Sequence, residues 1–492
     1  MLIINFIKMT EEDERENQKM NKNEKTELQE FIPKDSNNRL TAINSRDTND
    51  STSSEKTSLD NNEEKTCSMK EGSIQGGIFA LSSLALGTGA FSIPIRCTQL
   101  GLFWSLIFIV IMALAAFWTL SGLIKAGKLA KCEDYSPTVQ RILGKGPSIF
   151  IDIVIVVYLF GVFIQYQVII YSLIGMTFYE FFLKDDYKNY NAYEEEVWDS
   201  AKYKYPIMFG ITLLITPLCL LKDISKMRFA SMFGVCALIY SILVVVFETP
   251  WFYKDYLDKY DEKNDKTHAN WFNIKKGFTS ELNFFTGIAT FFFCYSCHPG
   301  AFPVYKTLKK NNKNKVNTVL FRSICLDLII YILIAICGFM TAPTNPQPLI
   351  IYRESVFKND FFMIIAKIAL ALDLLLSLPA NFASYRCSFF IVFFKTAEID
   401  NCRNILVTIP TLLLSTLIGA LYKKILDYIS LFGGFCSSIM CYLIPGVMMI
   451  LTNKDKIMSF RNILRISAIV CLTSIGFMGG IQTIRGMIIN KK

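Results

Sequence analysis

The sequence reads Leu86-Gly87-Thr88-Gly89-Ala90-Phe91-Ser92-Ile93-Pro94 in the middle of its first long apolar run, and this stretch decides the fold. It puts two glycines and a proline at a depth where a membrane helix should be continuous. Unwound backbone at that depth is tolerated only where it is buried in protein or lines a cavity. A later apolar run contains a similar interruption, Cys294-Tyr295-Ser296-Cys297-His298-Pro299-Gly300-Ala301-Phe302-Pro303. Either interruption alone fits a packing kink, whereas the occurrence of two such interruptions favours a feature that the fold repeats.

Apolar runs follow one another through most of the chain. We place eleven of them near residues 73–97, 101–124, 148–183, 206–221, 229–247, 283–304, 317–341, 361–394, 404–421, 425–451 and 463–488. A hydrocarbon core of ~30 Å takes about 20 such residues, and continuous hydrophobicity favours helices over a barrel. The interruptions lie five runs apart, so the second enters the membrane from the opposite side, as in an inverted repeat. We therefore expect an all-α polytopic membrane protein of about eleven transmembrane helices, with helices 1 and 6 broken.

The first 72 residues differ from the rest of the 492-residue chain, because they are rich in Glu, Lys, Asn, Ser and Asp. Such a segment cannot bury enough apolar surface to offset its ordering entropy. The formal net charge of +9 divides into about −5 on this segment and about +14 on the remainder. We predict two parts, a disordered cytoplasmic N-terminal tail over 1–72 and a transmembrane transporter domain over 73–492.

Many of the basic residues fall on loops that become cytoplasmic when the tail is cytoplasmic, as the positive-inside rule requires. They indicate topology and contact with anionic lipid, and not binding to nucleic acid. The sequence contains no Walker loop, no nucleophile elbow and no zinc-protease motif. We therefore expect neither an enzyme nor a metal site, and no cofactor.

The two interruptions also favour a class of substrate. In broken membrane helices the N-terminus of a half-helix presents free N–H groups and a positive dipole end to an anionic group. Unwound carbonyl groups can hold a cation in the same place. A zwitterionic amino acid carries both kinds of charge, so this arrangement suits an amino acid better than a neutral solute.

Five separate motifs carry a resemblance to a known family. They are Gly87 to Pro94, Gly161 with Gln165-Tyr166-Gln167 and Gly175, Cys297-His298-Pro299 with Phe302-Pro303-Val304-Tyr305, Ser377-Leu378-Pro379 with Arg386, and Phe432-Gly433-Gly434 through Pro445-Gly446. In this order they resemble the motifs of the amino acid/auxin permeases, which include sodium-coupled neutral and proton-coupled amino acid transporters. The resemblance covers about 420 residues, everything after the tail.

The resemblance implies a leucine-transporter-like fold, in which the first ten of eleven spans form a five-plus-five inverted repeat. It also implies alternating access driven by a proton or sodium gradient. By the same analogy the substrate carboxylate meets backbone N–H groups at the first interruption, while side chains of the third and sixth spans face the pocket. The residues so assigned are Gly87, Thr88 and Gly89 for the carboxylate, and Tyr166, Tyr295 and Ser296 for the pocket.

The coupling ion is less well defined by the sequence. The sodium-dependent branch of the family has an asparagine where Ser83 stands, whereas its hydroxyl-bearing residue of the eighth span is kept as Ser377. Backbone carbonyls could supply the remaining hard oxygens of a sodium site, so sodium dependence stays open. Asp373 lies one turn from Ser377 on the same helix face and is our first candidate for carrying a proton. The alternative is a structural pair with Lys367, and Asp327 in the seventh run is a second candidate.

We predict a secondary active transporter of amino acids, with neutral ones expected, that works as a single chain in contact with membrane lipid. The alternative is an amino-acid sensor that signals through its N-terminal tail without much flux. Either the plasma membrane or an acidic vacuolar or lysosomal membrane fits the sequence, because no sorting signal is legible. His298, at the second interruption, fits a polar niche or helix cap better than a pH switch.

Overall fold

In the computed structural model, the described residues are 73–183, 190–221, 228–261, 281–308, 315–341, 347–353, 360–396, 400–453 and 459–489. The predicted tail, 1–72, lies outside this part of the chain.

Every regular element in the described ranges is a helix. In the first half these are α2 (Ile74–Ala85), α3 (Thr88–Leu100), α4 (Leu102–Ala130), α5 (Tyr135–Leu143), α6 (Lys145–Phe178), η2 (Tyr179–Leu183), α7 (Tyr190–Tyr193), η3 (Glu194–Trp198), α8 (Ala201–Leu220) and α9 (Arg228–Asp261). In the second half they are α10 (Glu281–Cys294), α11 (His298–Thr307), α12 (Val316–Thr341), η7 (Ile350–Tyr352), α13 (Phe361–Phe389), η8 (Phe390–Phe394), α14 (Asn401–Leu421), α15 (Ile425–Phe432), η9 (Gly433–Leu443), α16 (Ile444–Leu451) and α17 (Phe460–Ile489).

The number of membrane spans agrees with the predicted runs. Within the described ranges, nine helices are long and apolar enough to cross a membrane, and the bent pair of α2 and α3 makes a tenth. Helices α10 and α11 are shorter, with 14 and 10 residues, and together they occupy the sixth predicted run. Each of the eleven predicted runs thus contains one long helix or one broken pair, and the predicted fold class is confirmed.

Both interruptions are real breaks in the helices. Helix α2 ends at Ala85, α3 begins at Thr88, and their axes differ by 52°. The N-cap of α3 is Gly87, in extended conformation and without a side-chain cap. In the second break, α10 ends at Cys294 and α11 begins at His298. Proline follows directly in the first turn of α11, where its missing N–H costs nothing.

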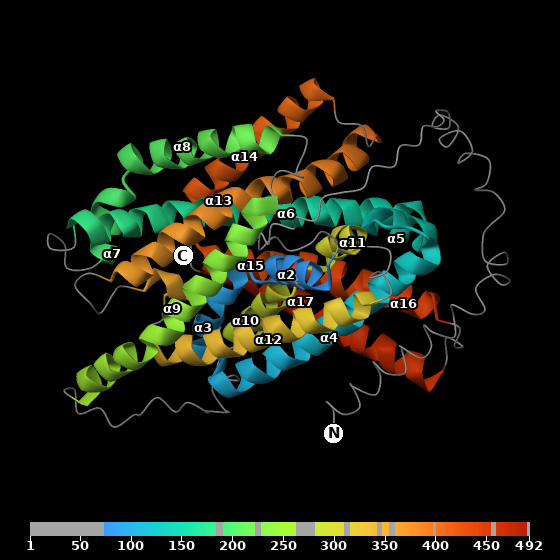
Figure 1. The fold of residues 1–492 in the computed structure, drawn as a ribbon, viewed down its shortest axis with the longest axis horizontal. Coiled ribbons are helices and arrows are strands. Elements are labelled where there is room, and N and C mark those ends of the chain that lie inside the picture. Colours follow the sequence, from blue (N-terminus) through green and yellow to red (C-terminus); the bar gives the residue numbers. More distant parts are fainter. Residues whose placement is uncertain are drawn as a thin grey trace, which may run out of the picture. The chain divides into compact units, whose positions relative to one another are not determined.

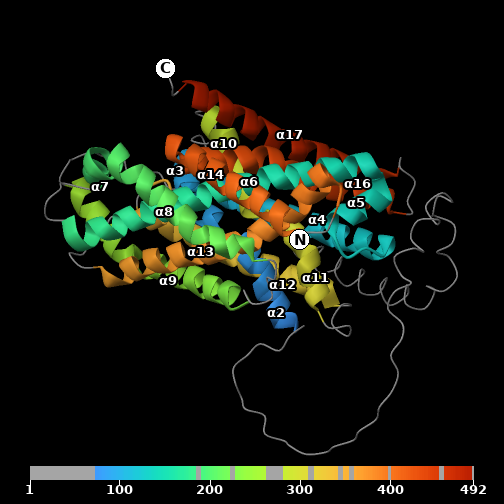
Figure 2. The same ribbon diagram turned by 90° about the horizontal axis from the view of Figure 1, so that it is seen from above.

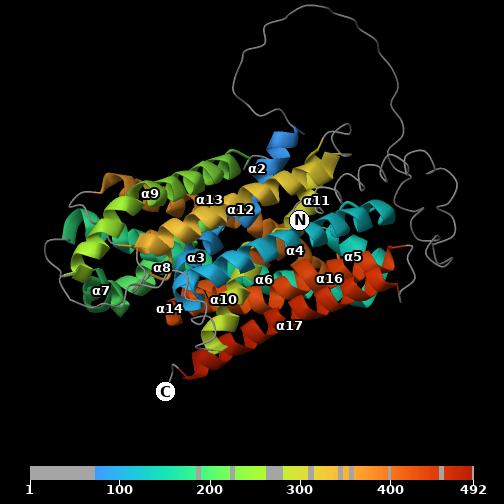
Figure 3. The same cartoon turned by 90° about the horizontal axis from the view of Figure 1, so that it is seen from below.

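The broken helices lie inside the bundle, where long helices cover them. Helix α3 packs against both α10 and α12, and α13 packs against α6 and α9 (Figure 1). In contrast, α17 lies at the edge of the bundle when it is seen from above and from below (Figures 2 and 3). Its most apolar stretch is only 22% buried. The eleventh span is therefore peripheral, as expected for a helix beyond a ten-helix repeat.

Helix α17 nevertheless touches the tenth span closely. A Cβ atom added at Gly434 of η9 would lie 2.5 Å from the backbone nitrogen of Gly480 and 2.8 Å from the carbonyl oxygen of Gly476. Small residues let the backbones of membrane helices approach in this way. The contact between η9 and α17 therefore depends on glycine on both sides.

Candidate functional site

A cavity of about 90 Å³ lies beside the first break. Five helices and the break itself contribute to its walls, and the predicted residues that line it are Ser83, Gly87, Thr88, Tyr166, Asp373 and Ser377. These six come from α2, α3 and its N-cap, α6 and α13, which are far apart in the sequence. The structure thus brings together two thirds of the nine residues that the sequence singled out.

One wall of the cavity is the N-terminal end of α3. Gly87 donates its N–H to the carbonyl oxygen of Ala85 at 2.9 Å, which closes the turn between the half-helices. A Cβ atom added at Gly87 would meet no heavy atom within 4 Å, so the space beside this residue is open. The first N–H groups of a helix have no intrahelical acceptor and carry the positive end of its dipole. This wall can therefore bind a carboxylate.

A further part of the lining comes from α13, α6 and α9. Asp373 is 5% exposed and accepts a hydrogen bond of 3.0 Å from the hydroxyl of Ser377, one turn further along α13. Tyr166 of α6 and Asn381 of α13 add a phenol and an amide to this part of the lining. Of the residues that line the cavity, Asp373 alone carries a formal charge. A carboxyl group and a helix N-terminus thus line the same cavity.

The remaining three predicted residues lie between the broken helices and do not line this cavity. A Cβ atom added at Gly89 would come within 3.1 Å of Cys294, so this glycine lets α3 approach α10. Tyr295 is fully buried, with its ring centroid 5.1 Å from that of Tyr331. The hydroxyl of Ser296 donates to the carbonyl oxygen of Phe292 at 2.8 Å and also bonds to Ser437.

The suggested pair between Asp373 and Lys367 is wrong. Lys367 is 1% exposed, and its Nζ atom lies 2.6 Å from Oε1 of Glu180 in η2, directly after α6. It also donates to the carbonyl oxygen of Arg353 at 3.3 Å. The partner lies 187 positions away in the sequence, so no local pattern could have revealed it.

His298 fills a polar niche between helices. It is fully buried, and its Nε2 atom lies 2.8 Å from the hydroxyl oxygen of Thr119 on α4. The side chain makes no cap for α11.

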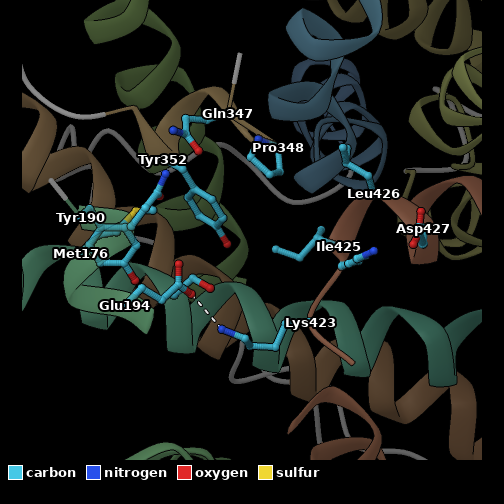
Figure 4. Close-up of a pocket in the computed structure, with 13 residues that line it drawn as sticks. Met176, Tyr190, Glu194, Gln347, Pro348, Tyr352, Lys423, Ile425, Leu426 and Asp427 are labelled. Carbon is cyan, nitrogen blue, oxygen red and sulfur yellow. Dashed lines mark hydrogen bonds and ion pairs between the residues drawn. The ribbon is translucent and has the colours of Figure 1, made fainter. Parts of the chain in front are cut away.

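A second and larger cavity, of about 430 Å³, was not predicted. It lies among three segments that join the spans, and its polar lining includes Tyr190, Glu194, Tyr352, Lys423 and Asp427. Figure 4 shows Lys423 bonded to Glu194, at 2.8 Å between Nζ and Oε1, while the hydroxyl of Tyr352 points into the cavity. Burial, and then the charge of Glu194, raise the pKa of Tyr190. No pattern in the sequence indicates this cavity, because its residues come together only through helix packing.

A helical bundle with two broken spans five apart, and with a carboxyl group and a helix N-terminus lining one cavity at the first break, is typical of an inverted-repeat membrane transporter. The profile of one family, described as transmembrane amino acid transporter protein, matches residues 70–489. The chain belongs to this family, the amino acid/auxin permeases. Its members are transporters and not enzymes, in agreement with the expectation from the sequence.

Curated relatives carry names of the same kind. The sodium-coupled neutral amino acid transporter 7 of Xenopus laevis is 24% identical, over 78% of this chain and 81% of the relative. The sodium-coupled neutral amino acid symporter 2 of Danio rerio is 21% identical, over 78% and 77%. The vacuolar amino acid transporter 5 of Saccharomyces cerevisiae is 22% identical, over 62% of this chain and 64% of the relative.

Solved structures support the fold. The crystal structure of MhsT in complex with L-phenylalanine matches with a TM-score of 0.53 at 14% identity, over 85% of this chain and 98% of that one. The crystal structure of a manganese transporter from Eremococcus coleocola matches with a TM-score of 0.50 at 13% identity, over 84% and 87%. At these identities the likeness establishes the leucine-transporter-like fold and nothing about the substrate.

Proposed function

We propose that this protein is a secondary active transporter that moves neutral amino acids across its membrane by alternating access, driven by a proton or sodium gradient. One observation carries the proposal. The N-terminus of α3 and the side chain of Asp373 line a single cavity at the first helix break. The curated relatives named for neutral and vacuolar amino acid transport favour the same substrate class.

In this proposal the substrate carboxylate is bound by backbone N–H groups at Gly87, Thr88 and Gly89, and Tyr166 contacts the substrate from α6. Tyr295 and Ser296 would reach the substrate only if the second break rearranged, since both are now engaged between helices. Alternating access requires such a rearrangement of the broken helices in any case.

Asp373 is the proposed coupling group, with Ser83 and Ser377 beside it. A carboxyl group that a serine hydroxyl orients, in a cavity with little water, can take up a proton from one side and release it to the other. If the coupling ion is sodium, the two serine hydroxyls and carbonyl oxygens at the break supply hard ligands for it.

The test is uptake into proteoliposomes that contain the purified protein, with a panel of labelled amino acids under an imposed proton or sodium gradient. We expect accumulation of neutral amino acids when one of the two gradients points inward, and none when both are absent. Equilibration that ignores both gradients would rule out secondary active transport.

The sensor alternative is tested by removing residues 1–70, which belong to the proposed cytoplasmic tail. We expect uptake per inserted protein to stay unchanged, because the cavity and both breaks lie after residue 72. Tight amino acid binding with no measurable flux in the full chain would favour the sensor.

We further propose that the protein is a monomer in contact with membrane lipid, in a plasma or vacuolar membrane, and binds no nucleic acid. An epitope tag at the N-terminus should react with antibody only after the membrane has been permeabilised.

A further inference from the structure

Asp327 on α12 is a carboxyl group that the proposed mechanism does not use. It is fully buried, at 0% exposure, in the middle of a long apolar helix. Neither of its carboxylate oxygens has a hydrogen-bond partner among the described residues. A carboxyl group in this situation is rare in a membrane helix and calls for a physical reason.

The groups around Asp327 are neutral. The hydroxyl group that faces Asp327 belongs to Ser82 of α2. The Oγ atom of Ser82 is, however, hydrogen-bonded to the Oγ atom of Ser323 at 2.8 Å. The other titratable side chains near the carboxyl group are the phenols and thiols of Tyr295, Tyr331, Cys297 and Cys325.

Charged groups on the other helices packed against α12 are engaged elsewhere. On α3, Arg96 donates to Ser430 at 2.6 Å, and on α9 Glu248 pairs with Arg353. On α4, the Nζ atom of Lys128 lies 5.9 Å from the ring centroid of Tyr305.

An ionised carboxylate without a cation or a hydrogen-bond donor is strongly disfavoured in a low-dielectric interior. The side chain is therefore expected to carry its proton in the conformation described here. Water could reach the Asp327 carboxyl group only if a neighbouring helix moved. Helix α2 packs against α12 and carries Ser82, the hydroxyl residue that faces Asp327.

The position of Asp327 ties it to both breaks. Ser82 faces Asp327, while the next residue, Ser83, lines the substrate cavity, so α2 separates the two places. One turn beyond Asp327, the hydroxyl of Tyr331 lies 2.7 Å from the carbonyl oxygens of both Ala85 and Cys294. These are the last residues of α2 and α10, so α12 contacts the end of each half-helix at its break.

We propose that Asp327 is a proton-carrying site of the transport cycle, placed behind the first break and separate from the substrate cavity. The carboxyl O–H bond breaks when α2 moves away from α12, the proton passes to entering water, and the carboxylate that remains is hydrated. Reprotonation lets α2 return. This inference rests on the proposed function, because it assigns a second coupling residue to the same cycle.

The test compares Asp327→Asn with the wild type in proteoliposomes. The variant should lose accumulation driven by a proton gradient, whereas exchange of labelled for unlabelled amino acid should persist. A purely structural role would reduce both rates together. The matched control is Asp152→Asn, at a buried carboxyl group of α6 that accepts hydrogen bonds from Ser136 and Ser388. The control should keep accumulation.

Infrared difference spectroscopy of the purified protein gives a readout that needs no transport. A protonated-carboxyl band in the wild type that disappears in Asp327→Asn supports the inference, even if no amino acid proves to be transported. The inference is overturned if the wild type lacks the band, or if Asp327→Asn keeps its proton-driven accumulation unchanged. It is also overturned if transport by the wild type requires sodium and does not depend on pH. If Asp327→Asn does not fold, Asp327→Glu is measured instead: a shifted band supports the inference, and an unshifted band overturns it.

Discussion

At the scale of single residues, Gly234 shapes the cavity at the first break by having no side chain. A Cβ atom added there would overlap Oδ1 of Asp373. The backbone of α9 therefore lies directly against the Asp373 carboxylate, where α9 and α13 pack together. Glycine here is required by the carboxyl group and not by backbone conformation.

Replacing this glycine should disturb the cavity without preventing membrane insertion. In Gly234→Ala the methyl group forces the Asp373 carboxylate to move, and overpacking of this kind costs about 1–3 kcal/mol. We expect uptake per inserted protein to fall. The control is Gly210→Ala on α8, because an added Cβ atom meets nothing within 4 Å there. Equal uptake by the two variants would contradict the assignment.

Removing the ionisable oxygen of Asp373 should flatten the dependence of uptake on pH. Proton-coupled uptake in the wild type is expected to be faster at acidic than at alkaline external pH, because the proton is a co-substrate. Asp373→Asn cannot release a proton, so its rate should no longer change with pH. Initial rates over a pH series measure this. A raised KM with an unaltered pH profile would instead mean that Asp373 binds the substrate ammonium group.

At the scale of helices, Tyr331 connects the two broken spans. Its hydroxyl is within hydrogen-bond distance of the last carbonyl of α2 and the last carbonyl of α10. Tyr331→Phe removes the donor, so the buried carbonyl of Cys294 loses this partner while that of Ala85 keeps the N–H of Gly87, and the loss costs roughly 1–3 kcal/mol. We expect a lower melting temperature of the purified protein. Tyr295→Phe is the control, because the hydroxyl of Tyr295 has no partner among the described residues. Its removal should cost less.

The buried pair of Lys367 and Glu180 joins α13 to η2, directly after α6. Lys367→Met leaves a buried carboxylate without its cation, and such a change typically costs about 3–5 kcal/mol. Thermal unfolding of the purified protein should show this loss, and the double variant with Glu180→Gln should recover much of it. Lys306→Met serves as the comparison, because the pair of Lys306 and Asp134 is half exposed and should contribute at most about 1 kcal/mol. Equal losses in both single variants would contradict the buried role.

At the scale of the whole transporter domain, the sequence predicts the helices and their breaks well. Membrane runs depend on local hydropathy, and the breaks depend on Gly87, Gly89 and the prolines after Cys297. The runs and the breaks are therefore both determined by residues that are neighbours in the sequence. Much of the cavity lining is also predictable, because its residues lie close together in the sequence. One group lies around the first break, and the other is the Asp373–Ser377 turn of α13.

Other features depend on how distant helices rotate against each other, which hydropathy does not determine. The sequence could not tell that Lys367 meets Glu180, that Tyr295 faces α12, or that three joining segments enclose the larger cavity. Side-chain direction within a buried helix follows from packing with partners far along the chain. Site residues on such helices are therefore the ones that sequence reasoning misplaces.

The glycine contact between η9 and α17 has a consequence for biogenesis. Gly434 can reach its final neighbours, Gly476 and Gly480, only after the ribosome has made the last span and the membrane has received it. Assembly of the tenth span therefore finishes after synthesis does, and a nascent chain that stalls before residue 460 leaves a bare glycine surface.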